Sequence, residues 1–189
     1  MKFLNKYNDS KNIRFDSFEI TLSLCHKRNL KNIVETGTAR GKKKFFFFKK
    51  FNWKDGMSTL MLSEFANYID GELHSCDISE LNIKNAKDFT KKYKNNVNFY
   101  VNDSIVFLQD FHKKIDLLYL DSFDGHDVEL ASQHQLKEAK AVINKLHKSS
   151  LVLLDDKGAK TLYSTNFLQQ KGFKVLAETD NQLLLSQLL

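Results

Sequence analysis

The sequence of 189 residues contains no proline and two cysteines, Cys25 and Cys76. Two cysteines are too few for a disulfide framework or a four-ligand zinc site. Both lie among apolar neighbours, so we expect them to be buried free thiols. The absence of proline, with 16 phenylalanines and abundant lysine and asparagine, is typical of a genome rich in A and T. The unusual composition is therefore a poor guide to function.

The sequence also lacks long apolar runs. None approaches the ~20 residues that a membrane-spanning helix needs. The first nine residues are polar and lack the apolar segment of a secretory signal, so we expect a cytoplasmic protein. The net charge is +6, but the lysines are scattered except at 42–50, and we do not expect nucleic-acid binding.

Strand-like and helix-like segments alternate along the chain, which favours a parallel sheet covered by helices on both faces. An amphipathic segment at 15–28 precedes them. Strands are expected at 32–35, 72–76, 97–101, 115–120, 151–154, 173–177 and 182–188. Helices are expected at 58–68, where Ser58 would be the cap, and at 79–93, 104–111, 128–146 and 161–170.

The last two strands are joined by the turn signal Thr179-Asp180-Asn181 and must be antiparallel. We therefore predict an α/β fold: a Rossmann-like, doubly wound, mostly parallel seven-stranded sheet with a C-terminal antiparallel hairpin. Residues 1–189 would form one domain. Within it, 1–29 would be an N-terminal helical extension and 42–54 a basic-aromatic loop insertion.

Acidic residues follow most of the predicted strands. Because the carboxyl ends of parallel strands share one edge of the sheet, these acids should converge there, where open α/β sheets bind ligands. Capping of the following helices is an alternative for any single acid, such as Asp103. The acids are Glu35, Asp77, Asp103, Asp121, Asp155 and Asp156.

A glycine-containing turn, Glu35-Thr36-Gly37-Thr38-Ala39-Arg40-Gly41, follows the first strand. Its glycines can adopt positive φ and let backbone approach a ligand closely. The spacing is not the G-x-G-x-x-G of dinucleotide-binding folds. An acid stands directly before the turn instead.

With this turn, Asp77, the step Asn102-Asp103-Ser104 and Asp121, the chain resembles the class I S-adenosylmethionine-dependent methyltransferases. The resemblance extends from about residue 30 to the end. It is greatest to small bacterial methyltransferase-like domains with an E-T-G-T-x-R-G turn and a D-G-x-S-T helix start, here at 55–59.

The resemblance implies a role for each strand-end acid. Glu35 would hold the ammonium group of the cofactor, and Asp77 would accept hydrogen bonds from the ribose hydroxyls. Asp103 and Ser104 would meet the adenine, and the turn would pass under the methionine part. The implied cofactor-binding residues are Glu35, Gly37, Thr38, Gly41, Asp77, Asp103, Ser104 and Asp121.

The acceptor side would follow the strand at 115–120. Asp121, Asp124 and His126 are the candidate catalytic residues, since a hydroxyl acceptor needs a base. His126 could equally be a solvated loop histidine.

Carboxylates of Asp121, Asp155 and Asp156 could instead hold Mg²⁺ or another divalent metal, in partial resemblance to catechol-type O-methyltransferases. Lys157 and Lys160 could otherwise neutralise these acids or bind an anionic substrate.

Two features depart from the family pattern. Ala39 stands where many relatives have glycine, and the segment 42–54 lengthens the distance from the turn to the next helix. This segment could be a lid over the site, a patch that contacts a membrane or an anionic partner, or an expansion driven by A and T codons.

The function expected from the sequence is S-adenosylmethionine-dependent methyl transfer to a small molecule, with oxygen as the expected acceptor atom. Two alternatives stay open. One is an NAD-type oxidoreductase or epimerase, and the other is a non-catalytic domain that binds a nucleotide cofactor.

Overall fold

The computed structural model describes residues 1–189 apart from 46–47, 52, 54–56, 125–126 and 189. Within this part of the chain, a seven-stranded sheet has the order β5-β4-β1-β6-β7-β9-β8. Neighbouring strands pair in parallel, except that β9 runs antiparallel to both β7 and β8. The predicted fold is confirmed. The strands are β1 (Asn32–Thr36), β4 (Glu72–Asp77), β5 (Val97–Val101), β6 (Ile115–Leu120), β7 (Leu146–Leu154), β8 (Lys174–Glu178) and β9 (Leu183–Ser186).

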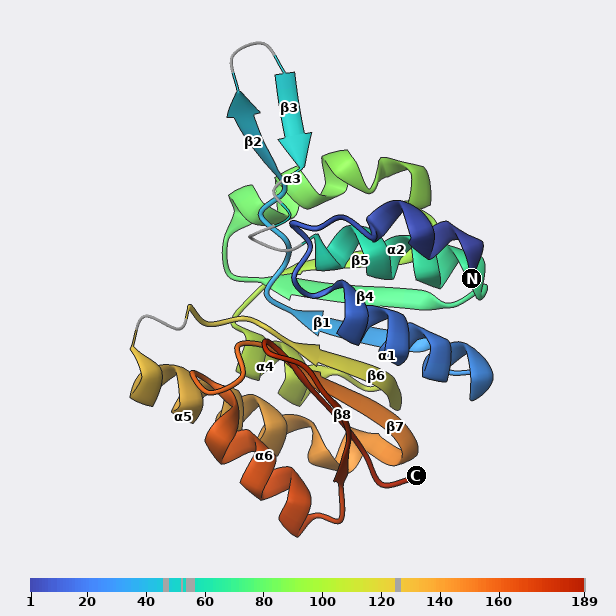
Figure 1. Cartoon of the computed structure of the whole chain (residues 1–189). Coiled ribbons are helices and arrows are strands. Elements are labelled where there is room, and N and C mark those ends of the chain that lie inside the picture. The colour runs from blue at the N-terminus through green and yellow to red at the C-terminus, as the bar shows by residue number, and fades with distance from the viewer. Residues whose placement is uncertain (46–47, 52, 54–56, 125–126, 189) are drawn as a thin grey trace.

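Helices cover both faces of the sheet (Figure 1). Helices α1 and α2 pack on one face and α4, α5 and α6 on the other, while α3 packs beside α2. None of the described helices is both long and apolar enough to cross a membrane. The helices are α1 (Phe15–Lys27), α2 (Ser58–Tyr68), α3 (Glu80–Phe89), α4 (Ser104–Asp110), α5 (Val128–Val142) and α6 (Thr161–Gln170).

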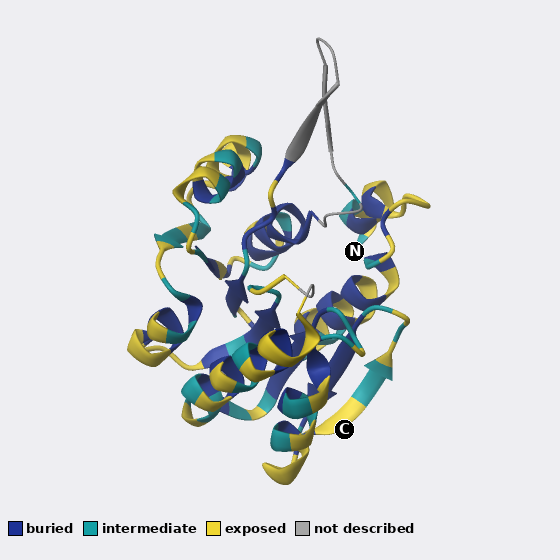
Figure 2. Cartoon of the chain, turned by 90° about the vertical axis from the view of Figure 1, so that its left-hand side faces the viewer, coloured by how far each residue is buried: buried dark blue, intermediate teal, exposed yellow. Residues whose placement is uncertain are grey.

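The central strands are apolar because both of their faces are buried (Figure 2). Successive side chains of a strand point to opposite faces. In β6, Leu117 and Tyr119 therefore join the core beneath α1 and α2, whereas Leu118 and Leu120 join the core beneath α4, α5 and α6. Cys25 and Cys76 are buried free thiols, as predicted.

Several element ends differ from the prediction. Ser58 is the first residue of α2 rather than its cap, and Met57 precedes it without a side-chain cap. The helix predicted at 79–93 ends at Phe89 and continues as a short 3-10 turn, Lys91–Tyr93. Strand β7 begins five residues before the predicted start, because the sequence His147–Ser150 is polar and does not resemble a buried strand.

The insertion after the glycine turn contains a small hairpin rather than only a loop. Strands β2 (Lys42–Phe45) and β3 (Phe48–Phe51) pair antiparallel, with Lys42 opposite Phe51, and form a separate two-stranded sheet. Pairing satisfies the backbone hydrogen-bonding groups of an otherwise irregular segment. The hairpin projects away from the body of the protein (Figure 1). Its predicted roles as a lid, as a contact surface or as a codon-driven expansion stay predictions.

Shortening the hairpin should leave the domain folded. Replacing residues 43–50 by Asn-Gly, a turn suited to a two-residue hairpin, should change the Tm by no more than about 2 °C, because β2 and β3 pair only with each other among the described strands. Phe65→Ala, a truncation in the buried face of α2, is the control and should lower the Tm by about 10 °C. A comparable loss in the shortened chain would show that the hairpin belongs to the core. Differential scanning calorimetry measures both.

Candidate functional site

A cleft with two adjoining parts lies at the carboxyl edge of the sheet, and four of the six strand-end acids line it: Asp77, Asp103, Asp121 and Asp156. One part has a volume of about 270 Å³ and is polar, with Thr38, Asp121 and Lys160 in its lining. The other has a volume of about 280 Å³ and includes Asp103 and Phe123. The two parts share four lining residues, Gly37, Asp77, Ile78 and Ser122. The sequence prediction that these acids converge therefore agrees with the structure.

The glycine turn brings β1 close to the end of β6. Gly37 has a φ of +82°, and a Cβ atom there would lie 2.1 Å from the backbone oxygen of Asp121. Only glycine fits both the positive φ and this close approach. The turn is fixed on its other side, because the Thr38 N–H donates to Asp77 Oδ2 at 3.1 Å and the Ala39 N–H donates to Thr59 Oγ1 at 2.8 Å.

Glu35 lies beneath the turn and is fully buried. Its Oε2 accepts hydrogen bonds from Thr59 Oγ1 at 2.8 Å and from Ser75 Oγ at 2.5 Å. Its Oε1 has no hydrogen-bond partner among the described residues. Burial raises the pKa of Glu35 to about 7, although the hydroxyl hydrogen bonds act in the opposite direction. The carboxyl group of Glu35 is therefore buried beneath the turn with one oxygen that has no described partner.

Asp77 and Asp103 accept backbone hydrogen bonds at the middle and at one end of the cleft. Asp77 accepts from the Ser79 N–H at 2.7 Å and from Asn82 Nδ2 at 3.1 Å, in addition to Thr38. Asp103 caps α4 by accepting from the N–H groups of the first turn. The capping alternative for Asp103 therefore holds, and the same residue also lines the cleft.

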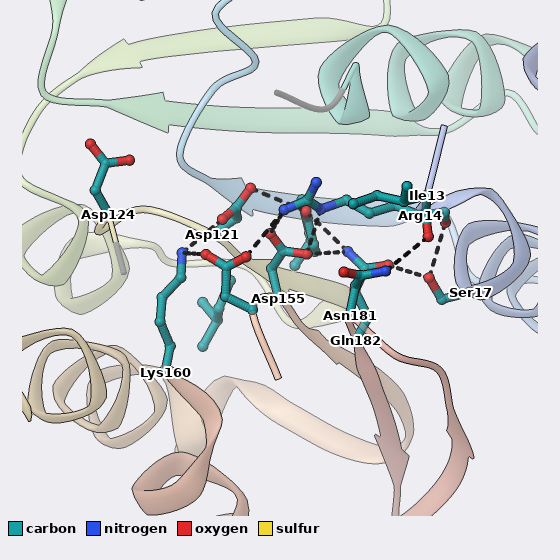
Figure 3. A network of polar contacts seen from close by, with 12 residues as sticks. Ile13, Arg14, Ser17, Asp121, Asp124, Asp155, Lys160, Asn181 and Gln182 are labelled. Carbon is teal, nitrogen blue, oxygen red and sulfur yellow. Dashed lines mark hydrogen bonds and ion pairs between the residues drawn. The ribbon is translucent and has the colours of Figure 1, made fainter. Parts of the chain in front are cut away.

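At the other end of the cleft, two cations hold three carboxylates (Figure 3). Arg14 binds Asp155 through two hydrogen bonds, from Nε and from Nη2, each 2.7 Å long. Lys160 Nζ lies 2.9 Å from Asp121 Oδ1 and 2.9 Å from Asp156 Oδ2. This end of the cleft therefore holds positive and negative side chains in alternation, and each is in direct contact with a group of opposite charge.

The neighbouring charges move the pKa values of Asp121 and Asp155 in opposite directions. Burial and the negative charge of Asp155 raise the pKa of Asp121 well above its usual range. Burial acts in the same direction on Asp155, but the hydrogen bonds and charge of Arg14 outweigh it and lower the pKa of Asp155. Asp121 is thus the member of this group that most readily holds a proton.

The other two catalytic candidates are Asp124 and His126. Asp124 is at the exposed rim, where it pairs with Arg40, and it stands apart from the buried network (Figure 3). His126 lies outside the described residues. Among the described candidates, Asp121 is the only one placed deep in the cleft.

The family follows from comparison with known proteins. A family model described as a methyltransferase domain matches residues 53–157, which is more than half of the chain. The chain belongs to this family. The match begins after the glycine turn and includes Asp77, Asp103, Asp121, Asp155 and Asp156. The resemblance to class I methyltransferases inferred from the sequence is confirmed.

Solved structures share the fold of this methyltransferase at low sequence identity. A methyltransferase from Geobacter sulfurreducens is 14% identical, with a TM-score of 0.59 over 90% of this chain and 77% of that chain. A putative methyltransferase from Streptococcus mutans, in complex with SAH, is 13% identical, with a TM-score of 0.61 over 89% and 96%. The N-methyltransferase NodS from Bradyrhizobium japonicum is 12% identical, with a TM-score of 0.63 over 94% and 96%. Among curated protein sequences, none gives a significant match.

Sequence reasoning missed several residues of the methyltransferase site. Arg14 gave no local signal, since its partner Asp155 lies 141 residues away. Phe123 and His134 line the cleft with their rings 5.1 Å apart, and His134 Nε2 lies 3.0 Å from Ser104 Oγ. Gln135 and Glu138, which lie in α5 with His134, are buried.

The predicted divalent-metal site does not fit this arrangement well. Oxygen atoms of Asp121, Asp155 and Asp156 lie within 4.8 Å of one another, close enough for shared coordination. Arg14 and Lys160 already bind these oxygens, so a metal would have to displace both cations. Of the two lysines expected to neutralise the acids, Lys160 does so, whereas Lys157 pairs with Glu178 instead.

Replacing Glu35 by glutamine should stabilise the protein more as the pH rises. Between pH 4.5 and about pH 7 the unfolded chain loses the Glu35 proton while the folded chain keeps it, so this group destabilises the wild type progressively. Glu35→Gln cannot lose a proton. Its free energy of unfolding, relative to that of the wild type, should rise by about 3 kcal/mol over this range. Urea denaturation at several pH values tests this, with the exposed Glu19→Gln as the control. Parallel stability profiles for wild type and E35Q would contradict the prediction.

Proposed function

We propose that the protein transfers a methyl group from S-adenosylmethionine to a hydroxyl oxygen of a small molecule. The observation that carries this proposal is the continuous cleft along the carboxyl edge. Hydrogen-bonding acids lie at one end and in the middle of the cleft, and the half-buried Asp121, whose pKa is raised, lies at the other end. Such a sequence of groups suits a long ligand with a purine, a ribose and an amino acid.

The residues present fit this cofactor. Ile78 and Phe123 offer exposed apolar surface beside Asp103 and Ser104, as a purine ring requires. The carboxylate of Asp77 suits two ribose hydroxyls, and the turn at Gly37 leaves backbone exposed for the amino-acid part. A buried Glu35 oxygen without a described partner supports a role in holding the ammonium, directly or through water. The Streptococcus mutans neighbour, which is in complex with SAH, adds support by analogy.

The acceptor end supports oxygen as the acceptor atom. When bound, S-adenosylmethionine supplies an electrophilic methyl group on its sulfonium. Asp121 can accept the hydroxyl proton, because burial and the negative charge of Asp155 raise its pKa and make its carboxylate a stronger base than an exposed aspartate. Lys160 Nζ, 2.9 Å from Asp121 Oδ1, would provide a positive charge near an acceptor oxygen that gives its proton to Asp121. The walls of the cleft position the acceptor and exclude water, which is most of what a displacement at a methyl group needs.

An NAD-dependent activity is not proposed. The turn lacks the dinucleotide-binding spacing, and the chain belongs to a methyltransferase-domain family. A non-catalytic domain that binds the cofactor is an outcome of the acceptor experiment below. We also propose that residues 1–189 act as one catalytic domain.

Removing the Asp77 carboxylate should weaken cofactor binding. Asp77→Ala should raise the Kd for S-adenosylmethionine at least tenfold, because two charge-assisted hydrogen bonds of ~1.5 kcal/mol or more are lost. Isothermal titration calorimetry measures the Kd. The matched control is Asp88→Ala, which removes an exposed acid at the far end of α3. Equal affinities for the two variants would remove Asp77 from the cofactor site.

The acceptor atom can be found with S-adenosylmethionine labelled in its methyl group and a panel of phenols, catechols, sugars, amines and thiols. We expect label on oxygen, and turnover at least a hundredfold lower in Asp121→Asn than in the control Asp88→Asn. Label found only on nitrogen or sulfur would refute the oxygen proposal. Tight cofactor binding without any labelled product would favour the non-catalytic alternative.

A further inference from the structure

The three carboxylates at the acceptor end lie close enough together to share a divalent cation. Asp121, Asp155 and Asp156 each offer an oxygen, and these oxygens lie within 4.8 Å of one another. Asp155 and Asp156 follow β7, and Asp121 follows the neighbouring strand β6. Oxygen ligands on adjacent strand ends are what Mg²⁺ and Mn²⁺ prefer. In the folded protein this negative charge is balanced by two side chains, Arg14 and Lys160.

Arg14 occupies one side of the set. It comes from the segment just before α1 and reaches Asp155 with both Nε and Nη2 at 2.7 Å. Gln182 Nε2 donates to the same Asp155 Oδ1 at 2.6 Å. Both oxygens of Asp155 therefore already accept hydrogen bonds, in a place where the Arg14 side chain is only 12% exposed. The bidentate geometry matches guanidinium to carboxylate and leaves Asp155 poorly placed to ligate a metal.

Lys160 occupies the other side. Its Nζ bridges Asp121 and Asp156 at 2.9 Å each, and its side chain is 3% exposed. The residue lies immediately before α6, one helical turn beyond Asp156. The charges of Asp121 and Asp156 raise the pKa of Lys160 despite its burial, so the ammonium stays charged. Lys160 therefore lies between two of the three oxygens that a metal would have to share.

The charge balance argues against a third cation in this place. The three carboxylates carry at most three negative charges, and Arg14 with Lys160 supplies two positive charges. A divalent ion bound among them would leave an excess of positive charge at short distances and low dielectric. Displacing Arg14 or Lys160 would instead leave a buried cation without its partner, which is strongly unfavourable.

We propose that Arg14 and Lys160 take the place of a divalent metal at the acceptor end of this methyltransferase and hold Asp121, Asp155 and Asp156 in position. The two residues are positioning residues, since they act through the acids that line the cleft. The inference about the cations stands on the contacts themselves, and only its link to the acceptor rests on the proposed function. It also gives the N-terminal segment, through Arg14, a part in building the site.

Binding of Mn²⁺, followed by electron paramagnetic resonance and calorimetry without cofactor or acceptor, tests this proposal. Wild-type protein should show no Mn²⁺ site that depends on Asp155, even at about 1 mM metal. Removing both cations with Arg14→Ala and Lys160→Ala should create such a site, with affinity increased at least tenfold. Adding Asp155→Asn to the double variant should abolish it. The charge-keeping pair Arg14→Lys and Lys160→Arg should continue to exclude the metal, which a purely structural role would not require.

Two results would overturn the proposal. One is wild-type Mn²⁺ binding that Asp155→Asn removes, and the other is a folded double variant that binds no more Mn²⁺ than the wild type. If the double variant does not fold, Lys160→Ala alone replaces it, since Lys160 bridges two of the three acids. Because no methyl transfer is measured, failure here is distinct from failure of the proposed function, which the labelled-acceptor experiment decides.

Discussion

The site depends on one electrostatic constraint: carboxylates that end parallel strands converge at one edge, where neighbouring helices and loops remove them from water. A buried carboxylate must be protonated, hydrogen-bonded or paired with a cation. This chain uses all three solutions along one cleft. Glu35 has a raised pKa, Asp77 accepts N–H groups, and Asp155 is paired with Arg14. The differences among these solutions give the two ends of the cleft different chemistry.

Acids satisfied by N–H donors keep their geometry at little electrostatic cost, and they suit the recognition of hydroxyls and amines. Asp77 and Asp103 are of this kind. Acids that share buried cations are coupled, so their pKa values move apart. Asp121 and Asp155 are of this kind, with the pKa raised for Asp121 and lowered for Asp155. The partners of each acid, rather than its residue type, therefore make the two ends of the cleft electrostatically different, and the proposed roles in recognition and in proton transfer use this difference.

The sequence predicted the sheet well because its strands are short apolar runs between clear helical periods. The strands at 97–101 and 115–120 and the helix at 161–170 have the predicted bounds. Local pattern could not predict the early start of β7, since the polar residues 147–150 resemble a turn. Nor could it predict the hairpin after the glycine turn, since its lysines and phenylalanines come in blocks without the alternation of a strand.

The candidate site was predictable only where its signal was local. A glycine turn after a strand and an acid after most strands can be seen in the sequence. The structure places Gly37 and Asp77 in the lining of the cleft and Glu35 beneath the turn, and their roles in cofactor binding stay predictions. The cations that pair with these acids could not be identified from the sequence. The contact from Arg14 to Asp155 spans 141 residues. Charge alone made Lys157 and Lys160 equal candidates for pairing with the acids. Only the path of the chain into α6 brings Lys160 to them and directs Lys157 to Glu178.

The contacts of the N-terminal segment are explained by the same need to pair buried carboxylates. It would be a peripheral extension if it only covered apolar surface, but its polar residues reach the strand ends. Besides the Arg14 contact, Ser17 donates to Gln182, which in turn donates to Asp155. Earlier in the segment, Tyr7 packs against Trp53, just beyond the hairpin. One short segment therefore contacts the region after the glycine turn, the acid group and the C-terminal strands. Movement of this segment would break the Arg14–Asp155 pair and leave a buried carboxylate without its cation. It would also disturb the core, because Leu4 and Tyr7 belong to the apolar cluster that covers one face of the sheet.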